Sequence, residues 1–258
     1  MARDIVSNLK FKKSTGKFNP SDFAVMLNEA YIATKRGDQI TTKTSFSPST
    51  LGYGHGNCPR YWYLAFSGVM FIDDNDAIAI ANMKQGTQAH ERLQGLIKTF
   101  PTFVSEEEEI KNEYPPIRGF IDLIMNVNGE KVIGEIKTAK QEVWDTRQAE
   151  MKSSSNHMLQ LLTYMKLTNA KEGFFLYENK NTQEVLIIPV QMNERNKKII
   201  DDTFDWLCQV WDNFKDGDLP YRHFTKSVST CKYCPVKTAC YELPREGVQI
   251  PAFVVPKL

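Results

Sequence analysis

The chain has 258 residues, 41% of them hydrophobic, which is enough to build the core of one large domain or of one domain with an appendage. Its 32 lysines and arginines almost balance 31 aspartates and glutamates, so the overall charge does not indicate a nucleic-acid partner, although a groove on a neutral protein can still be basic. No apolar run approaches the ~20 residues that span a bilayer, and the first residues lack the apolar stretch of a secretory signal. We therefore expect a cytoplasmic protein with no membrane partner.

The first 45 residues are polar and weakly patterned, with a helix predicted near residues 20–36. A new segment begins at Ser47, because a serine before a proline favours a turn. The remaining predicted elements are, in chain order, a helix over residues 86–100, strands over 106–113, 118–127 and 131–138, a helix over 153–168, strands over 173–179 and 184–190, and a helix over 193–215.

Asn128 and Gly129 separate two β-rich runs, and Asn-Gly in that position is the strongest short-range signal for a hairpin. If these two residues form the loop, the strands pair so that Asp122 lies directly opposite Glu135, with Cβ atoms about 5 Å apart. Two carboxylates at that spacing repel and destabilise a sheet, unless a divalent cation such as Mg²⁺ bridges them.

Lys137 lies two residues beyond Glu135 and therefore on the same face of the strand. Two acids and a lysine in one place can hold a metal ion, lower the pKa of its bound water and put a cation beside a phosphoryl oxygen. The alternative is a solvated hairpin face with an ordinary Glu–Lys neighbour pair. A turn register shifted by one residue would also remove the pairing of the two acids.

Four short patterns follow one another between residues 86 and 164. They are G-x-x-x-H at a predicted helix start (Gly86 to His90), G-x-x-D (Gly119 to Asp122), E-x-K (Glu135 to Lys137) and Q-x-x-x-Y (Gln160 to Tyr164). Each pattern alone is weak, but all four in this order resemble the nuclease domain of the RecB/AddB family within the PD-(D/E)XK superfamily.

The resemblance extends over residues 46–242. Its outer parts are Ser47-Pro48-Ser49, Cys58-Pro59-Arg60 and Cys231-x-x-Cys234-x₅-Cys240. This four-cysteine version is similar to the iron–sulfur nucleases of AddB and of CRISPR adaptation modules, and the lack of a fused motor resembles the small stand-alone members found in phages.

The resemblance implies an α/β fold of the restriction-endonuclease type, in which helices flank a mixed central β-sheet and a cysteine cluster tethers the C-terminal segment. The nuclease domain would cover residues 46–258 and be closed by the cluster segment at 225–245, leaving residues 1–45 as an N-terminal helical or extended segment. DNA would be the partner, as single strands or duplex ends, in the host cytoplasm if the chain is viral. A homo-oligomer, or a recombination or replication partner, stays open.

The resemblance also assigns roles to residues of the predicted site. Mg²⁺ or Mn²⁺ would be bound by His90, Asp122, Glu135 and the carbonyl group of Ile136. One departure is Ile121, which stands where the superfamily is named for a proline. Because that proline varies widely in the superfamily, we do not expect the change to remove activity.

Three more residues would act beside the metal ion. Lys137 would orient the attacking water or neutralise the scissile phosphate. Gln160 and Tyr164 share a helix face and would organise the site or contact the DNA backbone. Structural interpretations remain for the helical residues: His90 alone would be a surface histidine, Gln160 needs a hydrogen-bond partner in its apolar surroundings, and Tyr164 could pack in the core.

Three closely spaced cysteines, Cys231, Cys234 and Cys240, have Cys58 as their natural fourth partner, and a cluster of the four would close a very long loop. In a reducing compartment such cysteines more often bind metal than form disulfides, and an odd total of five argues the same way. A single C-x-x-C and the prolines after Cys58 and Cys234 favour, with the resemblance, a structural [4Fe–4S] cluster, with zinc as the alternative. Cys208, in an apolar helix, is expected to be a buried core thiol.

These features together predict a metal-dependent DNA nuclease, a phosphodiester hydrolase that acts as an exonuclease on single-stranded DNA or DNA ends. The alternative is a DNA-binding or structural protein with a catalytically silent nuclease fold and a zinc site. The cationic and aromatic run from Arg60 to Tyr63 could stack on single-stranded DNA or pack around the cysteine cluster.

Overall fold

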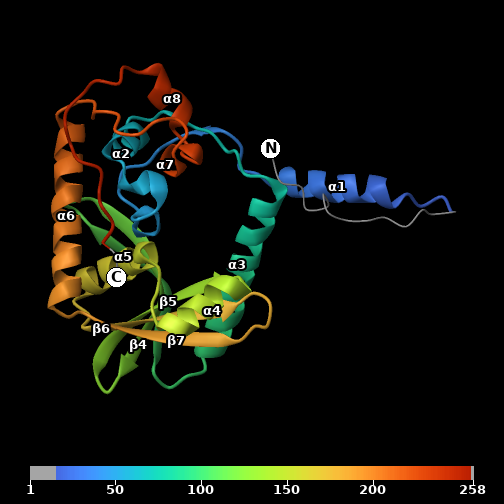
Figure 1. The fold of residues 1–258 in the computed structure, drawn as a ribbon. Helices are drawn as coiled ribbons and strands as arrows, with labels where there is room; N and C mark the ends of the chain where they lie inside the picture. Colours follow the sequence, from blue (N-terminus) through green and yellow to red (C-terminus); the bar gives the residue numbers. More distant parts are fainter. Residues whose placement is uncertain (1–15, 257–258) are drawn as a thin grey trace.

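The structure is a computed structural model that describes residues 16–256 (Figure 1). Its elements, in chain order, are α1 (Pro20–Ile32), β1 (Gln39–Ile40), the 3-10 helices η1 (Pro48–Thr50) and η2 (Gly54–Asn57), α2 (Pro59–Phe66), β2 (Met70–Phe71), α3 (Ala77–Ile97), β3 (Phe103–Asn112), β4 (Ile117–Val127), β5 (Glu130–Ala139), α4 (Gln141–Glu150), α5 (Ser155–Thr168), β6 (Glu172–Asn179), β7 (Val185–Gln191), α6 (Glu194–Lys215), α7 (Ser229–Lys232) and α8 (Lys237–Glu242). Within residues 16–256, none of the helices combines the length and apolar character that a bilayer-crossing segment needs.

A five-stranded mixed sheet with strand order β3-β4-β5-β6-β7 forms the centre of the fold. β5 and β6 run parallel, whereas the other neighbours in this sheet are antiparallel. α3 packs on one face of the sheet through Leu93 and Ile97, and the buried side chains of α5 pack on the other face. α6 lies against α5 and α2 (Figure 1). The predicted fold class, a mixed central sheet flanked by helices, is confirmed.

The β4–β5 hairpin has the predicted two-residue loop. Asn128 and Gly129 both have positive φ angles, 54° and 86°, as a type I′ turn requires. Val127 pairs with Glu130, and this register continues without a shift to the pair of Leu123 and Gly134. The predicted register is therefore confirmed, and its next two residues are the acids that the hairpin was expected to place opposite each other.

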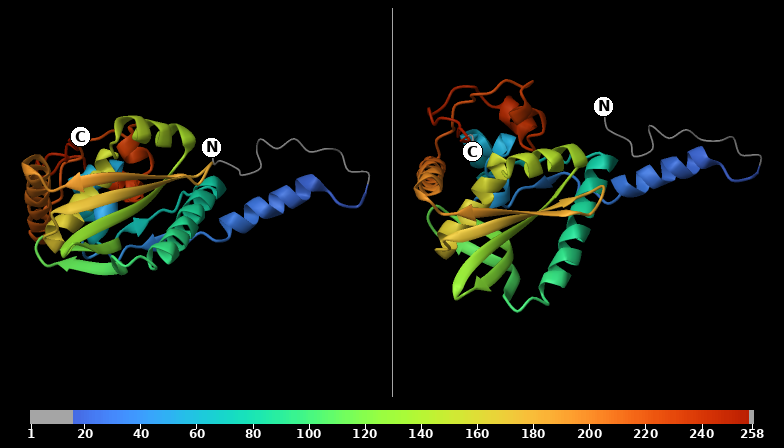
Figure 2. Two further views of the ribbon diagram at one scale, coloured as in Figure 1. Left: turned by 90° about the horizontal axis from the view of Figure 1, so that it is seen from below. Right: turned by 60° about the horizontal axis from the view of Figure 1, so that its bottom comes forward.

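The helices that flank the sheet differ from the prediction in two places. α3 begins at Ala77 rather than at residue 86, because the side chain of Asp76 accepts a hydrogen bond from the backbone N–H of Ala79 and caps the helix there. Gly86 consequently lies inside the helix and not at its start. The sequence pattern did not predict α4, a mostly polar helix that buries Trp144. α1 projects from the end of α3, away from the sheet (Figure 2).

A buried arginine on α2 holds the C-terminal segment through hydrogen bonds. The guanidinium group of Arg60, which is 0% exposed, donates hydrogen bonds to the carbonyl oxygens of Pro220 at 2.7 Å and Pro244 at 2.6 Å. Tyr61 and Trp62 are also buried, and the indole N–H of Trp62 donates to a backbone carbonyl. The interpretation that Arg60, Tyr61 and Trp62 pack inside the protein is therefore confirmed. The prediction that these three residues stack on DNA is wrong.

We expect Arg60→Met to destabilise the protein by about 3 kcal/mol, because the buried carbonyl oxygen of Pro220 and the partly buried one of Pro244 would lose their donor while the side-chain volume is kept. Urea unfolding followed by tryptophan fluorescence measures the effect. The matched control is Arg36→Met, since Arg36 is exposed. Equal stability of the two variants would contradict a fastening role for Arg60.

Candidate active site

Three carboxylates lie side by side on the three neighbouring strands β3, β4 and β5. Asp122 of β4 is next in register to Glu135 of β5. On its other side, the β3 pairs Glu106–Leu123 and Glu108–Ile121 enclose Glu107, which therefore lies opposite Asp122. Glu107 has a φ of 48°, a left-handed conformation that is uncommon for a residue other than glycine.

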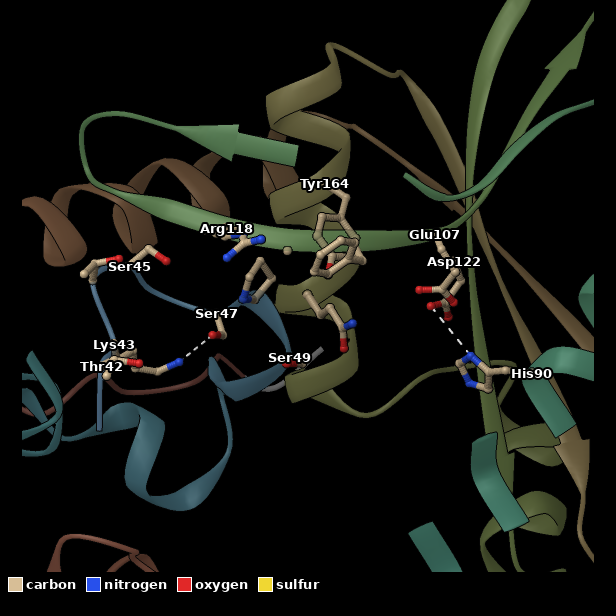
Figure 3. A pocket seen from close by; sticks show the side chains of 15 residues that line it. Thr42, Lys43, Ser45, Ser47, Ser49, His90, Glu107, Arg118, Asp122 and Tyr164 are labelled. Atoms are coloured by element: carbon tan, nitrogen blue, oxygen red, sulfur yellow. Dashed lines mark hydrogen bonds and ion pairs between the residues drawn. The ribbon is translucent and has the colours of Figure 1, made fainter. Parts of the chain in front are cut away.

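Asp122, the central acid of this row, is nearly buried and has a different neighbour for each oxygen. Its Oδ2 accepts a hydrogen bond from the backbone N–H of Ile136 at 2.7 Å, and its Oδ1 lies 3.7 Å from Nδ1 of His90 on α3. Figure 3 shows His90 facing the carboxylates of Asp122 and Glu107. Burial raises the pKa of Asp122 and outweighs the opposing effect of the nearby His90 and Lys137.

Glu135 is fully buried, and one of its two carboxylate oxygens has no hydrogen-bond partner. Its Oε1 lies 2.5 Å from the ammonium nitrogen of Lys137, whereas Oε2 is buried and unpaired. Burial, and then the charge of Asp122, raise the pKa of Glu135 to about 8. Burial alone would lower the pKa of Lys137, but the carboxylates of Glu135 and Asp122 outweigh it and raise that pKa.

Gln160 and Tyr164 reach the site from α5, as their spacing predicted. The Oε1 of Gln160 accepts a hydrogen bond from the ammonium group of Lys137 at 3.2 Å. Tyr164 packs so closely on Gly119 that a Cβ atom there would lie 2.8 Å from its hydroxyl oxygen. The G-x-x-D and Q-x-x-x-Y patterns are thus linked by one close contact, which needs a glycine on the strand because the tyrosine occupies the space beside it.

All the residues predicted for the site therefore lie close together. Glu107 lies beside them, although the sequence pattern did not predict it as a residue of the site. This glutamate lies in an acidic run that the pattern assigned to an exposed strand. Three residues together offer ligand atoms for a cation, because atoms of His90, Glu107 and Asp122 all lie within 4.8 Å of one another. A signal was present, since the register of β3 against β4 would have placed one acid opposite another.

A cavity of about 520 Å³ opens beside these acids and continues away from them toward a polar wall (Figure 3). Its wall carries a run of hydroxyl side chains from Thr42 to Ser49, together with Lys43 and Arg118. Lys43 donates to the hydroxyl oxygen of Ser47 at 2.6 Å, and burial lowers its pKa. A second cavity, of about 1060 Å³, lies along α3 and shares His90 and Glu107 with the first. Glu107 thus lies where the two cavities meet, and Asp122 lines the first of them.

The four cysteines predicted to form a cluster line one cavity between α2 and the C-terminal segment. Burial raises the pKa of Cys58 to about 11 and that of Cys234 to about 12, so thiolates at these positions need a compensating cation. Cys208 lies apart on α6, where it is only partly buried and contacts Tyr114. The prediction of a buried core thiol at Cys208 is therefore wrong, because its helix position lies at the edge of the core.

Comparison with solved structures finds the same overall fold in an alkaline exonuclease, LHK-Exo, from Laribacter hongkongensis. The match has a TM-score of 0.50 and 14% identity, and it covers 73% of this chain and 95% of that chain. LHK-Exo in complex with dAMP matches with a TM-score of 0.50 and 15% identity, over 67% of this chain and 89% of that chain. No match was found among curated proteins.

A sequence model of the PD-(D/E)XK nuclease superfamily matches residues 102–241, which is more than half of the chain and includes the strands that carry all three acids. The mixed sheet, the adjacent carboxylates and the lysine two residues after Glu135 agree with that match. The chain belongs to the PD-(D/E)XK nuclease superfamily.

Proposed function

We propose that the protein is a divalent-metal-dependent deoxyribonuclease, acting as an exonuclease on single-stranded DNA or on duplex ends. The observation that carries the proposal is the unpaired, fully buried Oε2 of Glu135 beside the buried Asp122. Two buried carboxylates at this spacing are costly unless a cation binds them. Membership of the superfamily supports a nuclease, and the alkaline exonuclease LHK-Exo supports the exonuclease mode.

The donor set fits Mg²⁺ or Mn²⁺, because carboxylate oxygens are the ligands that hard divalent cations prefer. Asp122 and Glu135, with the carbonyl group of Ile136, would hold the ion, and His90 lies on the other side of Asp122. A bound divalent ion would supply charge for activating water and for stabilising the phosphoryl group.

Lys137 provides the second positive charge of the site. Gln160 accepts a hydrogen bond from its ammonium group and so holds Lys137 beside Glu135. In this position the ammonium group can orient the attacking water or neutralise an oxygen of the scissile phosphate. Its raised pKa keeps it charged throughout the physiological range.

The two cavities support a path for a DNA strand across the acids. Lys43, Arg118 and the hydroxyl groups of the first cavity suit phosphate oxygens, to which basic and hydroxyl side chains commonly bind. The second cavity continues from His90 and Glu107 along α3. A strand lying in both would place a phosphate at the meeting point, beside Asp122.

Time courses on end-labelled DNA test this function. With Mg²⁺ or Mn²⁺ we expect linear single strands or duplex ends to be degraded progressively from a terminus, circular single strands to stay intact, and chelation of the metal to stop cleavage. Rapid cutting of the circles would replace the exonuclease assignment with an endonuclease one. Absence of cleavage with every divalent metal and substrate would refute the nuclease proposal.

Metal binding should depend on pH because of Glu135. A cation needs the ionised carboxylate, and the pKa of about 8 means that protons compete with the cation below that pH. The apparent affinity for Mg²⁺ should therefore rise from pH 6 and level off above about pH 8, as titration calorimetry can measure.

The stability of the metal-free protein should change in the opposite direction. The unfolded pKa of a glutamate is about 4.3, so between that pH and about 8 the folded chain binds more protons at Glu135 than the unfolded chain does. The free energy of unfolding should therefore fall as pH rises through this window. A Glu135→Gln variant should lose that part of the dependence, and equal pH profiles for the two proteins would contradict the assignment.

We propose further that Cys58, Cys231, Cys234 and Cys240 hold a structural [4Fe–4S] cluster, with zinc as the alternative. All four line one cavity, which supports a shared ligand. The single C-x-x-C and the prolines after Cys58 and Cys234 favour the iron–sulfur cluster over zinc.

A further inference from the structure

The strands β5 and β6, which run parallel in the central sheet, end side by side at the same edge. Their last paired residues are Ala139 and Asn179, and the backbone N–H of Lys180 donates to the carbonyl oxygen of Ala139 at 2.8 Å. Lys140 and Lys180 therefore leave the sheet together. The crevice outside the carboxyl ends of parallel strands is where open α/β sheets commonly bind ligands. Two cationic side chains follow the strands at this edge.

A third cavity, of about 320 Å³, opens at this edge of the sheet. Both lysines line it, together with the exposed Glu142 of α4 and four carboxamide side chains from α3, α4 and the β6–β7 turn. Among the described residues, those that line the cavity are all polar or charged. The cavity therefore suits a ligand that is itself polar or charged, and not a nucleobase that needs an apolar or aromatic surface.

Hydrogen bonds from a buried asparagine fix one wall of this cavity. Asn179 is 0% exposed, and its amide group donates to the side-chain oxygen of Gln141 at 2.9 Å. The backbone N–H of Gln141 donates in turn to the side-chain oxygen of Asn181 at 3.2 Å. These bonds join the first turn of α4 to the β6–β7 turn, so the two segments that carry the lysines are held at a fixed separation.

The cavity carries an excess of positive charge, since two ammonium groups face the single carboxylate of Glu142. The ammonium group of Lys180 donates to the carboxamide oxygen of Asn82 at 3.4 Å. Burial, and then the charge of Lys140, lower the pKa of Lys180. Within residues 16–256, neither lysine forms an ion pair with an acid. An anion between the two ammonium groups would relieve their repulsion.

This third cavity continues the second one along α3, away from the acids. Asn82 lies one helical turn before Gly86, which lines the second cavity, and Lys137 of the second cavity lies three residues before Lys140. The eight residues of α3 between Asn82 and His90 span about 12 Å. Because a DNA strand carries a phosphate about every 3.4 Å along a duplex, and at wider spacing when it is extended, this distance corresponds to about two to four nucleotides.

We propose that Lys140 and Lys180 form a phosphate-binding position for a DNA strand, about two to four nucleotides from the scissile phosphate. The inference rests on the proposed nuclease function and states where the substrate of that site runs. A contact of this kind holds the register of the strand without reading its sequence. The carboxamide groups of Asn82 and Asn181 can donate to further oxygens of the phosphate or the sugar.

Fluorescence anisotropy on the full-length protein tests the position. The probe is a single-stranded oligothymidylate of about twelve nucleotides, and Ca²⁺ replaces Mg²⁺, with gels to check that the DNA stays intact. A double variant, Lys140→Gln with Lys180→Gln, should bind the probe about 10-fold more weakly than the wild type at ~0.1 M salt. Its slope of log affinity against log salt should be smaller by about 1.4, because each phosphate contact on a single strand contributes about 0.7.

The matched control is Lys131→Gln with Lys171→Gln. These two exposed lysines lie at the amino ends of the same two strands, so the control removes the same charge from the opposite edge of the sheet and should keep the affinity and slope of the wild type. Lys140→Gln alone should give about half of the change in slope. Melting temperatures of all variants show whether weaker binding reflects a lost contact or a disturbed fold.

A scan along the strand locates the phosphate. One phosphate at a time is replaced by an uncharged methylphosphonate, and the loss of affinity is compared between the wild type and the double variant. At the phosphate that the lysines hold, the wild type should lose affinity and the double variant should not, because its partners there are already removed. We expect this difference about two to four phosphates from the bond that the wild type cleaves with Mg²⁺.

Equal binding by the double variant and its control, or equal losses in both proteins at every methylphosphonate, would overturn the phosphate position. Cleavage of linear DNA by the wild type is measured in parallel. A wild type that cleaves DNA although the lysines do not affect binding would leave the nuclease function standing without this position. A wild type that cleaves no DNA but loses affinity with the lysines would refute the nuclease function and keep a DNA-binding position. A wild type that neither binds nor cleaves DNA would refute both.

Discussion

Asp122→Asn should lower the rate of DNA cleavage by about 10³-fold or more at saturating Mg²⁺. Asp122 is the middle acid of the row, and a cation on either side would use one of its oxygens. An amide of the same shape can still accept the N–H of Ile136, so the loss should come from charge and not from misfolding. Initial rates on end-labelled linear DNA measure the change.

The stability of the same variant should move in a different direction from its activity. Removing a charge from this buried, metal-free site relieves its repulsion with neighbouring acids, so the melting temperature should stay equal or rise. Asp201→Asn is the matched control, because Asp201 lies on α6 at the surface and pairs with Lys166. If Asp122→Asn kept most of the activity, a role of Asp122 in the mechanism would be contradicted.

The hairpin of the site could be predicted from sequence because its information is local. Asn128 and Gly129 both adopt the positive φ angles that their residue types tolerate best, and this turn sets the register of both strands. The positions of Asp122, Glu135 and Lys137 follow from that register by counting. The same argument explains why Gln160 and Tyr164, one helical turn apart, reach the site together.

Glu107 was harder to place because the four-residue connection between β3 and β4, residues 113–116, lacks the Asn-Gly signal that fixes the register of β4 and β5. Glu107 has a positive φ, and its carboxylate accepts a hydrogen bond from Gln94 of α3. An acidic run is also typical of a solvent-exposed strand. The pairing of Glu107 with Gln94 joins two elements that no local pattern relates.

Arg60 is a second case in which distant contacts decide the role. Beside aromatic residues, its charge is also typical of a surface that binds DNA. The residues that cover it, Pro220 and Pro244, lie more than 150 positions away in sequence. The motif predicted that this segment belongs beside the cysteines, but only the path of the C-terminal segment shows that the guanidinium group is buried.

The cysteine cavity should set the stability of the whole C-terminal segment. Cys58→Ser removes the one thiol that lies far from the others in sequence, and with it the link between α2 and the segment that contains α7 and α8. Loss of a metal clip that closes so long a loop should cost about 3 kcal/mol or more, lowering the melting temperature by about 6–12 °C in a chain of this size. Calorimetry, with metal analysis of the same samples, measures both effects.

Cys208→Ser is the matched control for this loss, because Cys208 is a thiol outside the cavity. It should keep the metal content and melting temperature of the wild type, whereas Cys58→Ser should lose bound metal and become sensitive to protease near α7 and α8. Broad visible absorbance after anaerobic purification would identify iron and sulfide, and a colourless protein with one zinc ion would replace the cluster by zinc. If Cys58→Ser matched Cys208→Ser in metal content and stability, the four thiols would share no metal, and burial of Arg60 alone would have to fasten the segment.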